Sequence, residues 1–207
     1  MKEEFGECSE AEKNEKRLKS FFKTYFGPNT DELLQKHFVK DFFSEIFERV
    51  GAVKILFNFL TPDVLNKDNT EFWGEAIKYV TDVSELVYVH KGLLSKISID
   101  TIQAHWGYPL IQETPLAKTL FDFGLDVFKL PRPTSLMHVS IVLYIGQAYV
   151  GTIGPREQKT YYAMPTMFLK LPPAVSLPIG LCADRFTRQL IIEEVGDDAG
   201  IVSPLNI

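Results

Sequence analysis

Three residues in the second half of the chain have the chemistry of a nucleophilic triad. Cys182 carries a thiol, His138 an imidazole that can act as a base near neutral pH, and Asp184 a carboxylate. Arg185 follows Asp184, and a cation close to a cysteine lowers the pKa of its thiol. No known signature surrounds Cys182. The alternative is therefore a buried cysteine that happens to lie near a surface Asp–Arg pair.

The four histidines, at positions 37, 90, 105 and 138, are scattered along the chain. Zinc sites use closely spaced ligands, and neither an HxH nor an HxxxH pattern occurs here. The segments 90–92 and 105–107 can still be read as paired ligands or as the wall of an aromatic pocket. We favour histidines that face solvent or are satisfied in the core, and we predict no metal site and no cofactor.

Glycines at 146, 151 and 154 superficially look like a phosphate-binding loop. Such a loop is followed by a helix start and a Lys-Ser/Thr pair, which are absent here. Turn and bulge glycines explain the pattern better.

Arginines near the C-terminus offer a different anion site. Arg185 and Arg188 can bind carboxylates or phosphates if their segment meets Arg156 and Lys159. The alternative is that they form ordinary surface pairs with the carboxylates at 193 and 194.

A proline-rich connector over 171–179 gives the best lead to a partner. Its apolar residues stand between prolines, and an exposed extended segment of this kind can dock on a groove or a sheet edge of another protein. The alternative is a connector that lies on its own core. The predicted binding residues, with the two arginines added, are Pro172, Pro173, Val175, Leu177, Pro178, Arg185 and Arg188.

The element that must position these residues is the run 136–151, which contains no Asp, Glu, Lys or Arg. Its β-branched and aromatic residues favour strands, and Gly146-Gln147 is typical of a hairpin turn between them. The apolar part is too short for a membrane span. We therefore predict a buried strand pair that helices must cover.

Helices are predicted in the first half of the chain. Apolar residues at helical spacing indicate helices over 9–26, from 29 or 30 to 50, from 69 or 70 to 83, a short one from 98 or 100 to 106, and one that begins at Thr114-Pro115. The period leaves 53–60 and 86–89 open between helix and strand. Beyond the central pair, 160–171 indicates an irregular or edge strand and 186–195 a last strand.

The predicted fold class is therefore α+β, with N-terminal helices packed on a mainly antiparallel C-terminal sheet. We expect one domain over 1–207, with a helical part at 9–130, a β-rich part at 134–195, and loose ends at 1–8 and 200–207. The formal net charge of −5 argues against nucleic acid as the partner. Two distant cysteines and no apolar leader at the N-terminus favour a reducing, cytoplasmic setting.

Two functions fit this sequence. The first is a component of protein–protein interaction or assembly without catalytic activity, which binds another protein or itself through an aromatic face of its helices and the connector. The alternative is a small-molecule-binding domain or enzyme with a pocket near His138 and Cys182, flanked by Tyr144 and Tyr149. We favour the first because no catalytic signature is visible.

Overall fold

The computed structural model of the chain describes residues 45–59, 70–107, 114–134, 136–153, 160–169, 171 and 176–205. Several sequence predictions fall outside these residues. They are the helix over 9–26, most of the helix up to 50, the turn that begins at 154, and the connector residues 172–175.

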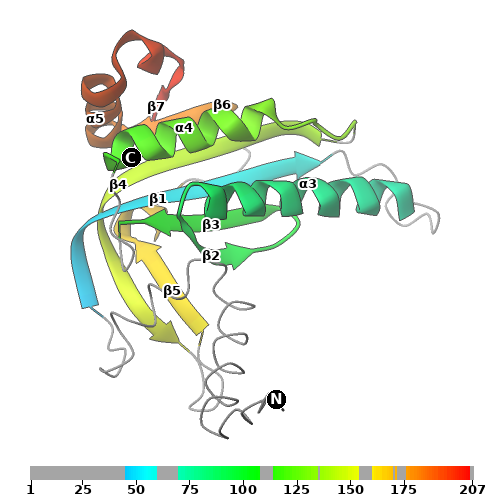
Figure 1. Cartoon of the computed structure of the whole chain (residues 1–207), viewed down its shortest axis with the longest axis horizontal. Coiled ribbons are helices and arrows are strands. Elements are labelled where there is room, and N and C mark those ends of the chain that lie inside the picture. The colour runs from blue at the N-terminus through cyan, green and yellow to red at the C-terminus, as the bar shows by residue number, and fades with distance from the viewer. Residues whose placement is uncertain are drawn as a thin grey trace, which may run out of the picture.

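A seven-stranded mixed sheet forms the centre of the molecule (Figure 1). Its strands are β1 (Glu45–Phe59), β2 (Leu93–Ile97), β3 (Thr101–Trp106), β4 (Leu136–Ile153), β5 (Thr160–Pro165), β6 (Gly180–Asp184) and β7 (Ser203–Leu205). The order is β2-β3-β1-β4-β6-β7, and β5 pairs with the C-terminal part of β4. β6 and β7 run parallel to their neighbours, whereas the other pairs are antiparallel.

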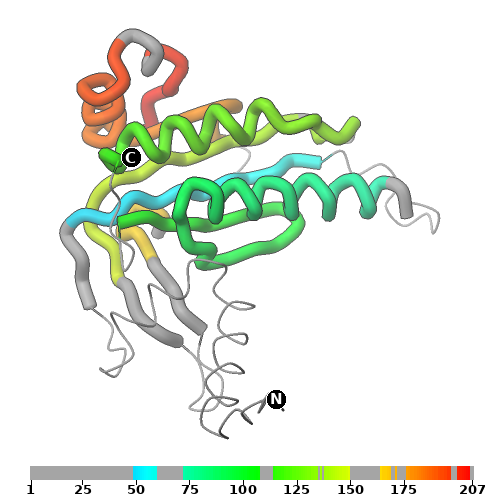
Figure 2. The backbone as a smooth tube through the Cα atoms, in the orientation of Figure 1, coloured from blue at the N-terminus to red at the C-terminus, as the bar shows by residue number. Residues whose placement is uncertain are grey.

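Three helices cover one face of this sheet. They are α3 (Thr70–Val89), α4 (Leu116–Lys129) and α5 (Arg185–Val195), and α3 and α4 run side by side (Figure 2). The main hydrophobic core lies between these helices and the sheet. Two short 3-10 helices, η1 (Thr166–Leu169) and η3 (Gly196–Ile201), complete the described elements. The opposite face of the sheet, which we call the far face, carries a smaller hydrophobic cluster.

The α+β class is confirmed, but the predicted segregation of helices into the N-terminal part is wrong. Strand β1 precedes α3, and α5 follows β6, so helices and strands alternate along the chain. Strands that run parallel in one sheet need a long crossover connection, which is usually a helix. Helix α5 makes this connection between the neighbours β6 and β7, whereas α3 (from β1 to β2) and α4 (from β3 to β4) each cross over one intervening strand.

Strand β1 replaces the predicted helix end at 45–50 and settles the open segment 53–60 as strand up to Phe59. Its side chains alternate. Val53 and Ile55 lie in the main core under the helices, whereas Ala52 and Leu56 lie in the cluster on the far face. The apolar residues at 46 and 50, whose four-residue spacing indicated a helix, lie in this strand. Pairing of β1 with β3 and β4 determines its conformation.

The predicted hairpin turn at Gly146-Gln147 is also wrong, because β4 runs through it as one strand of 18 residues. Gly146 serves a different purpose there. A side chain at this position would place its Cβ 2.4 Å from the hydroxyl oxygen of Tyr144. The glycine therefore permits a close approach of the Tyr144 ring within a continuous strand.

Two further elements differ from their predictions and one open segment is resolved. The predicted short helix up to residue 106 is β3, and the predicted last strand at 186–195 is α5. Asp184 caps α5 by accepting a hydrogen bond from the backbone nitrogen of Thr187 at 2.7 Å. Residues 86–89 are the last turn of α3.

The predicted helix after Thr114-Pro115 is confirmed as α4. Its buried side chains share one face, which packs on the sheet. Among the described residues, no helix combines the length and apolarity needed to cross a membrane.

Candidate functional site

Polar side chains gather where β1 ends and β4 begins. Asn58 and His138 are directly paired across these two strands, and Asn58 Nδ2 lies 3.2 Å from His138 Nε2. Alternation along both strands places them on the far face, away from the helices. Both side chains are partly exposed. When the amide nitrogen donates, Nε2 must accept, which leaves the ring proton on Nδ1. The pair therefore offers further donors and acceptors to a ligand.

The turn between β2 and β3 lies beside this end of β1. The backbone nitrogen of Phe57 donates to the carbonyl oxygen of Asp100 at 2.9 Å, and Thr101 Oγ1 donates to the carbonyl of Ile55 at 2.9 Å. Ser98 Oγ donates to Asp100 Oδ1 at 2.6 Å. These bonds fix an exposed carboxylate close to the end of β1. Asp100 was predicted only as one of two starts of a short helix, so this placement was missed.

A row of nitrogen-bearing side chains crosses the far face next to the turn. Lys54 of β1 pairs with Gln103 of β3, which pairs with Lys96 of β2. Burial and, to a smaller extent, the charge of Lys96 lower the pKa of Lys54. None of these three residues was predicted as a site residue. The available signal was a lone charge inside the apolar run from Val50 to Phe59.

Ser140 lies on the same face, two residues along β4 from His138. It is 1% exposed, and its Oγ has no hydrogen-bond partner among the residues that the structure describes. A buried hydroxyl without a partner is rare in native proteins, so it needs an explanation such as a water or a ligand. Its strand neighbours are Leu56 on one side and Gly180 on the other.

The structure does not bring Cys182, His138 and Asp184 together as a triad. Cys182 pairs with Val142, four residues along β4 from His138, and its Sγ donates to the carbonyl of Ile141 at 3.5 Å. Burial raises the pKa of this thiol to about 12, so it stays protonated. Asp184 is used as the cap of α5. Of these three residues only His138 belongs to the polar cluster at the end of β1, and the catalytic role of the set stays a prediction.

The described members of the predicted partner-binding set have different environments. Leu177 is buried in the hydrophobic cluster of the far face, next to the partly buried Pro178. Arg188 donates from Nε to the carbonyl of Val202 at 2.9 Å, whereas Arg185 is exposed. Pro172, Pro173 and Val175 lie outside the described residues, as do Arg156 and Lys159. The binding role of this set remains a prediction.

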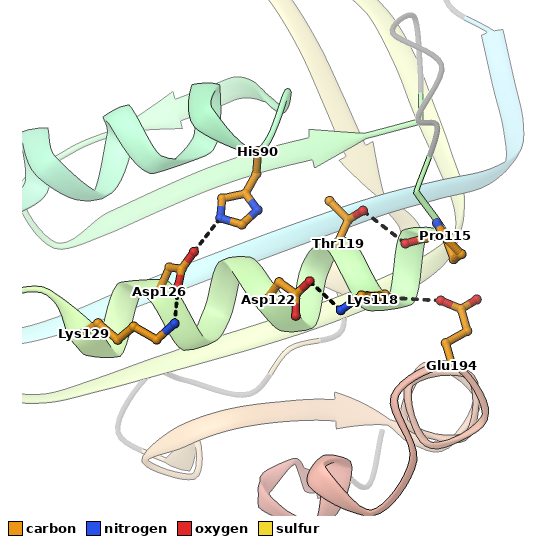
Figure 3. A network of polar contacts seen from close by, with 8 residues as sticks. All are labelled: His90, Pro115, Lys118, Thr119, Asp122, Asp126, Lys129 and Glu194. Atoms are coloured by element: carbon orange, nitrogen blue, oxygen red, sulfur yellow. Dashed lines mark hydrogen bonds and ion pairs between the residues drawn. The ribbon is translucent and has the colours of Figure 1, made fainter.

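The other described histidines have separate environments. His105 is buried, lies with Nδ1 2.8 Å from Ser95 Oγ, and has a pKa lowered to about 3 by burial. His90 lies 3.0 Å from the Asp126 carboxylate, which also accepts a hydrogen bond from Lys129 at 2.7 Å (Figure 3). No group of three or more His, Cys, Asp or Glu suited to a metal ion occurs in the part of the chain that the structure describes.

Known structures share this architecture, although the sequence itself has no match. The sequence matches no known family model and no curated protein. The structure, however, is similar to adenylyl cyclase CyaB from P. aeruginosa, with a TM-score of 0.61 and 14% identity over 74% of this chain and 84% of that one.

Two other solved structures are similar to the same extent. One is the catalytic core of a rhodopsin-guanylyl cyclase with converted specificity in complex with ATPαS, with a TM-score of 0.59 and 15% identity over 72% of this chain and 83% of that one. The other is a dimeric guanylyl cyclase domain of the RhoGC fusion protein from Blastocladiella emersonii, with a TM-score of 0.58 and 12% identity over 73% and 87%. At these identities the likeness establishes the fold, which is that of nucleotidyl cyclase catalytic domains.

This likeness corrects the functional prediction. A component without catalytic activity was favoured because no catalytic signature was visible in the sequence. The matched structures are catalytic domains, and the match spans most of each of them. The alternative, a small-molecule-binding domain or enzyme, agrees better with the fold.

Proposed function

We propose that this chain is a nucleotidyl-cyclase-type domain that binds a purine nucleoside triphosphate on the far face of its sheet, at the end of β1. The main support for this proposal is the fold, which is similar to that of adenylyl and guanylyl cyclase structures over about three quarters of the chain. The cluster of Asn58, Asp100 and His138 supports this location because its donors and acceptors converge at one end of the sheet.

Each residue of the cluster has a role suited to such a ligand. The Asp100 carboxylate can share a magnesium ion with the triphosphate, since Mg²⁺ is usually bound through one or two carboxylates together with substrate phosphates and water. The described residues hold no larger group of ligands, so the nucleotide itself would supply most of the oxygens. His138 can transfer a proton and is held by Asn58.

Nucleotide binding by the purified chain tests this proposal. Fluorescent analogues of ATP and GTP are titrated with Mg²⁺, and the cyclic nucleotide is measured by chromatography. We expect saturable binding and an increase of about tenfold in Kd for Asp100→Asn, or about 1.4 kcal/mol. Asp82→Asn is the matched control, because Asp82 lies on α3 and pairs with Lys78.

Two results would contradict the proposal. One is the absence of saturable binding of either nucleotide by protein whose circular dichroism shows it to be folded. The other is an equal loss of affinity in Asp100→Asn and Asp82→Asn, which would place the nucleotide elsewhere.

Self-association also remains a proposal. It is supported by the dimeric structure of the guanylyl cyclase domain from Blastocladiella emersonii. Light scattering of the chain with and without nucleotide would measure its oligomeric state.

A further inference from the structure

Lys54 occupies an unusual position for a lysine. Its neighbours Val53 and Ile55 are fully buried in the core under the helices, so strand alternation directs Lys54 to the far face. There it lies between Ala52 and Leu56, which belong to the hydrophobic cluster of that face. A charged side chain in such surroundings loses part of its hydration, which is unfavourable unless another group compensates for the loss.

The nearest charge makes this position less favourable still. Lys96 lies two strands away in the same row, with Gln103 between them. Within the described part of the chain, neither ammonium group forms an ion pair with a carboxylate, whereas Lys78, Lys118 and Lys129 each do so on a helix. As far as the structure describes the chain, two like charges therefore share one row without a counter-charge.

The spacing of this row suits one extended anion. Neighbouring strands lie about 5 Å apart, so the Cα atoms of Lys54 and Lys96 are about 10 Å apart. Each lysine side chain has a flexible four-carbon stem, so both ammonium groups can approach one group or flank a short chain of groups. The Gln103 amide lies between them and can donate as well. The row borders the turn that carries Asp100, because Leu56, the next residue of β1 on this face, pairs with Thr101.

We propose that Lys54, Gln103 and Lys96 bind the phosphate chain of the nucleotide. This rests on the proposed function, and it assigns the polyphosphate to the middle of the far face, between the row and Asp100. Lysine is a common phosphate ligand, acting as a point charge. A polyphosphate supplies the several negative charges that the row lacks, and the acidic net charge of −5 disfavours a nucleic acid as their source.

Binding of inorganic tripolyphosphate tests the row without relying on the base. Calorimetry compares tripolyphosphate, ATP and adenosine on the full chain and on the variants Lys54→Met, Lys96→Met and the double variant. We expect each single change to weaken tripolyphosphate and ATP about tenfold, and the double variant to lose binding. We expect any affinity for adenosine to be unchanged. Lys78→Met is the matched control, since Lys78 is exposed on α3 and pairs with Asp82.

Folding is checked separately. Methionine has a side chain of similar length without the charge. We therefore expect the midpoint temperature of thermal unfolding of Lys54→Met to be no lower than that of the unaltered protein. Should that variant unfold, Lys96→Met on the exposed end of β2 and the charge-preserving Lys54→Arg keep the test open. We expect Lys54→Arg to retain most of the tripolyphosphate affinity.

The outcomes separate this inference from the proposed function. Tripolyphosphate binding that persists in the double variant, or that is absent from the unaltered chain, overturns the inference even if ATP binds through Asp100. Tripolyphosphate binding that depends on both lysines supports it, and it does so even if neither ATP nor GTP binds more tightly than tripolyphosphate. In that last case the anion site stands, and the comparison of Asp100→Asn with Asp82→Asn decides the proposed nucleotide function.

Discussion

The two faces of the sheet satisfy their polar groups in different ways. Under the helices, Ser84 Oγ donates to the carbonyl of Val80 at 2.7 Å and Trp106 Nε1 to the carbonyl of His90 at 2.9 Å. On the far face, the Ser140 hydroxyl has no partner, and neither Lys54 nor Lys96 has a counter-charge among the described residues. Since unpaired buried polar groups are costly, the helix face is the better satisfied of the two, and the unpaired groups of the far face support the ligand site proposed there.

Some polar groups on the far face do have hydrogen-bond partners, so the difference between the faces is confined to one region. His105, which pairs with Ala52 on this face, lies beside Ser95 and is neutral because burial lowers its pKa to about 3. The unpaired groups are concentrated instead on β1, the adjoining part of β4, and the end of β2. That is the region next to the Asp100 turn.

The largest effect is expected from the helix face. Phe123 is fully buried, and its ring lies 5.7 Å from that of His90 and 5.1 Å from that of Trp106. We expect Phe123→Ala to lower the free energy of unfolding by about 3–5 kcal/mol, measured by urea denaturation. Ile97→Ala, at a position that is 55% exposed, serves as the control and should change it little. A loss below about 1 kcal/mol for Phe123→Ala would remove the idea of a stabilising helix face.

A smaller effect is expected from Asp126 of α4, which pairs with Lys129 of the same helix and lies beside His90, the residue that follows α3. The hydrogen bond from Lys129 and, less strongly, that from His90 lower the pKa of Asp126. A lowered carboxyl pKa stabilises the folded state above the ordinary value of 3.8, and this stabilisation is lost as the pH falls through the lower folded value. Asp126 and Lys129 are substantially exposed, so Asp126→Asn should cost less than about 1 kcal/mol at neutral pH.

The check on Asp126 is the pH dependence of unfolding. The difference between Asp126→Asn and the unaltered protein should shrink towards zero as the pH is lowered below the folded pKa. A difference that stays constant across this range would mean that the asparagine changes packing rather than charge.

The smallest effect is expected on the far face. Ser140→Ala removes a hydroxyl that has no partner, so the free energy of unfolding should change by no more than about 0.5 kcal/mol. Thr187→Val is the contrasting variant, because Thr187 Oγ1 accepts a hydrogen bond from the Ile145 nitrogen at 2.9 Å and is fully buried. That change should cost about 1–3 kcal/mol. Equal losses in the two variants would erase the distinction between the faces.

Local signals predicted the parts of the fold that depend on local structure. Thr114-Pro115 marked the start of α4, and the apolar spacing that follows matches its buried face. The helix α5 was missed because Leu190-Ile191-Ile192 resembles a strand. The helical signal was the cap residue Asp184, followed at helical spacing by Thr187 and Ile191, which the structure shows to be buried. The apolar run obscured this signal.

The sheet could not be predicted because its pairings join distant parts of the chain. Strand β1 lies between β3 and β4, which are about 50 and 90 residues further along the sequence. Of the polar cluster, His138 was found by residue type, whereas Asn58 meets it only through the register of β1 with β4. Asp100 and Lys54 acquire their positions from the same pairings.

The continuity of β4 has a consequence for how the chain tolerates changes in length. Residues 140–143 are bonded to β1 on one edge and to β6 on the other, and the strand then continues to β5. One inserted or deleted residue there would turn every following side chain over to the opposite side of the sheet and misalign several ladders together. Tolerated insertions should therefore fall in the loops, because β4 sets the register of the strands that pair with it.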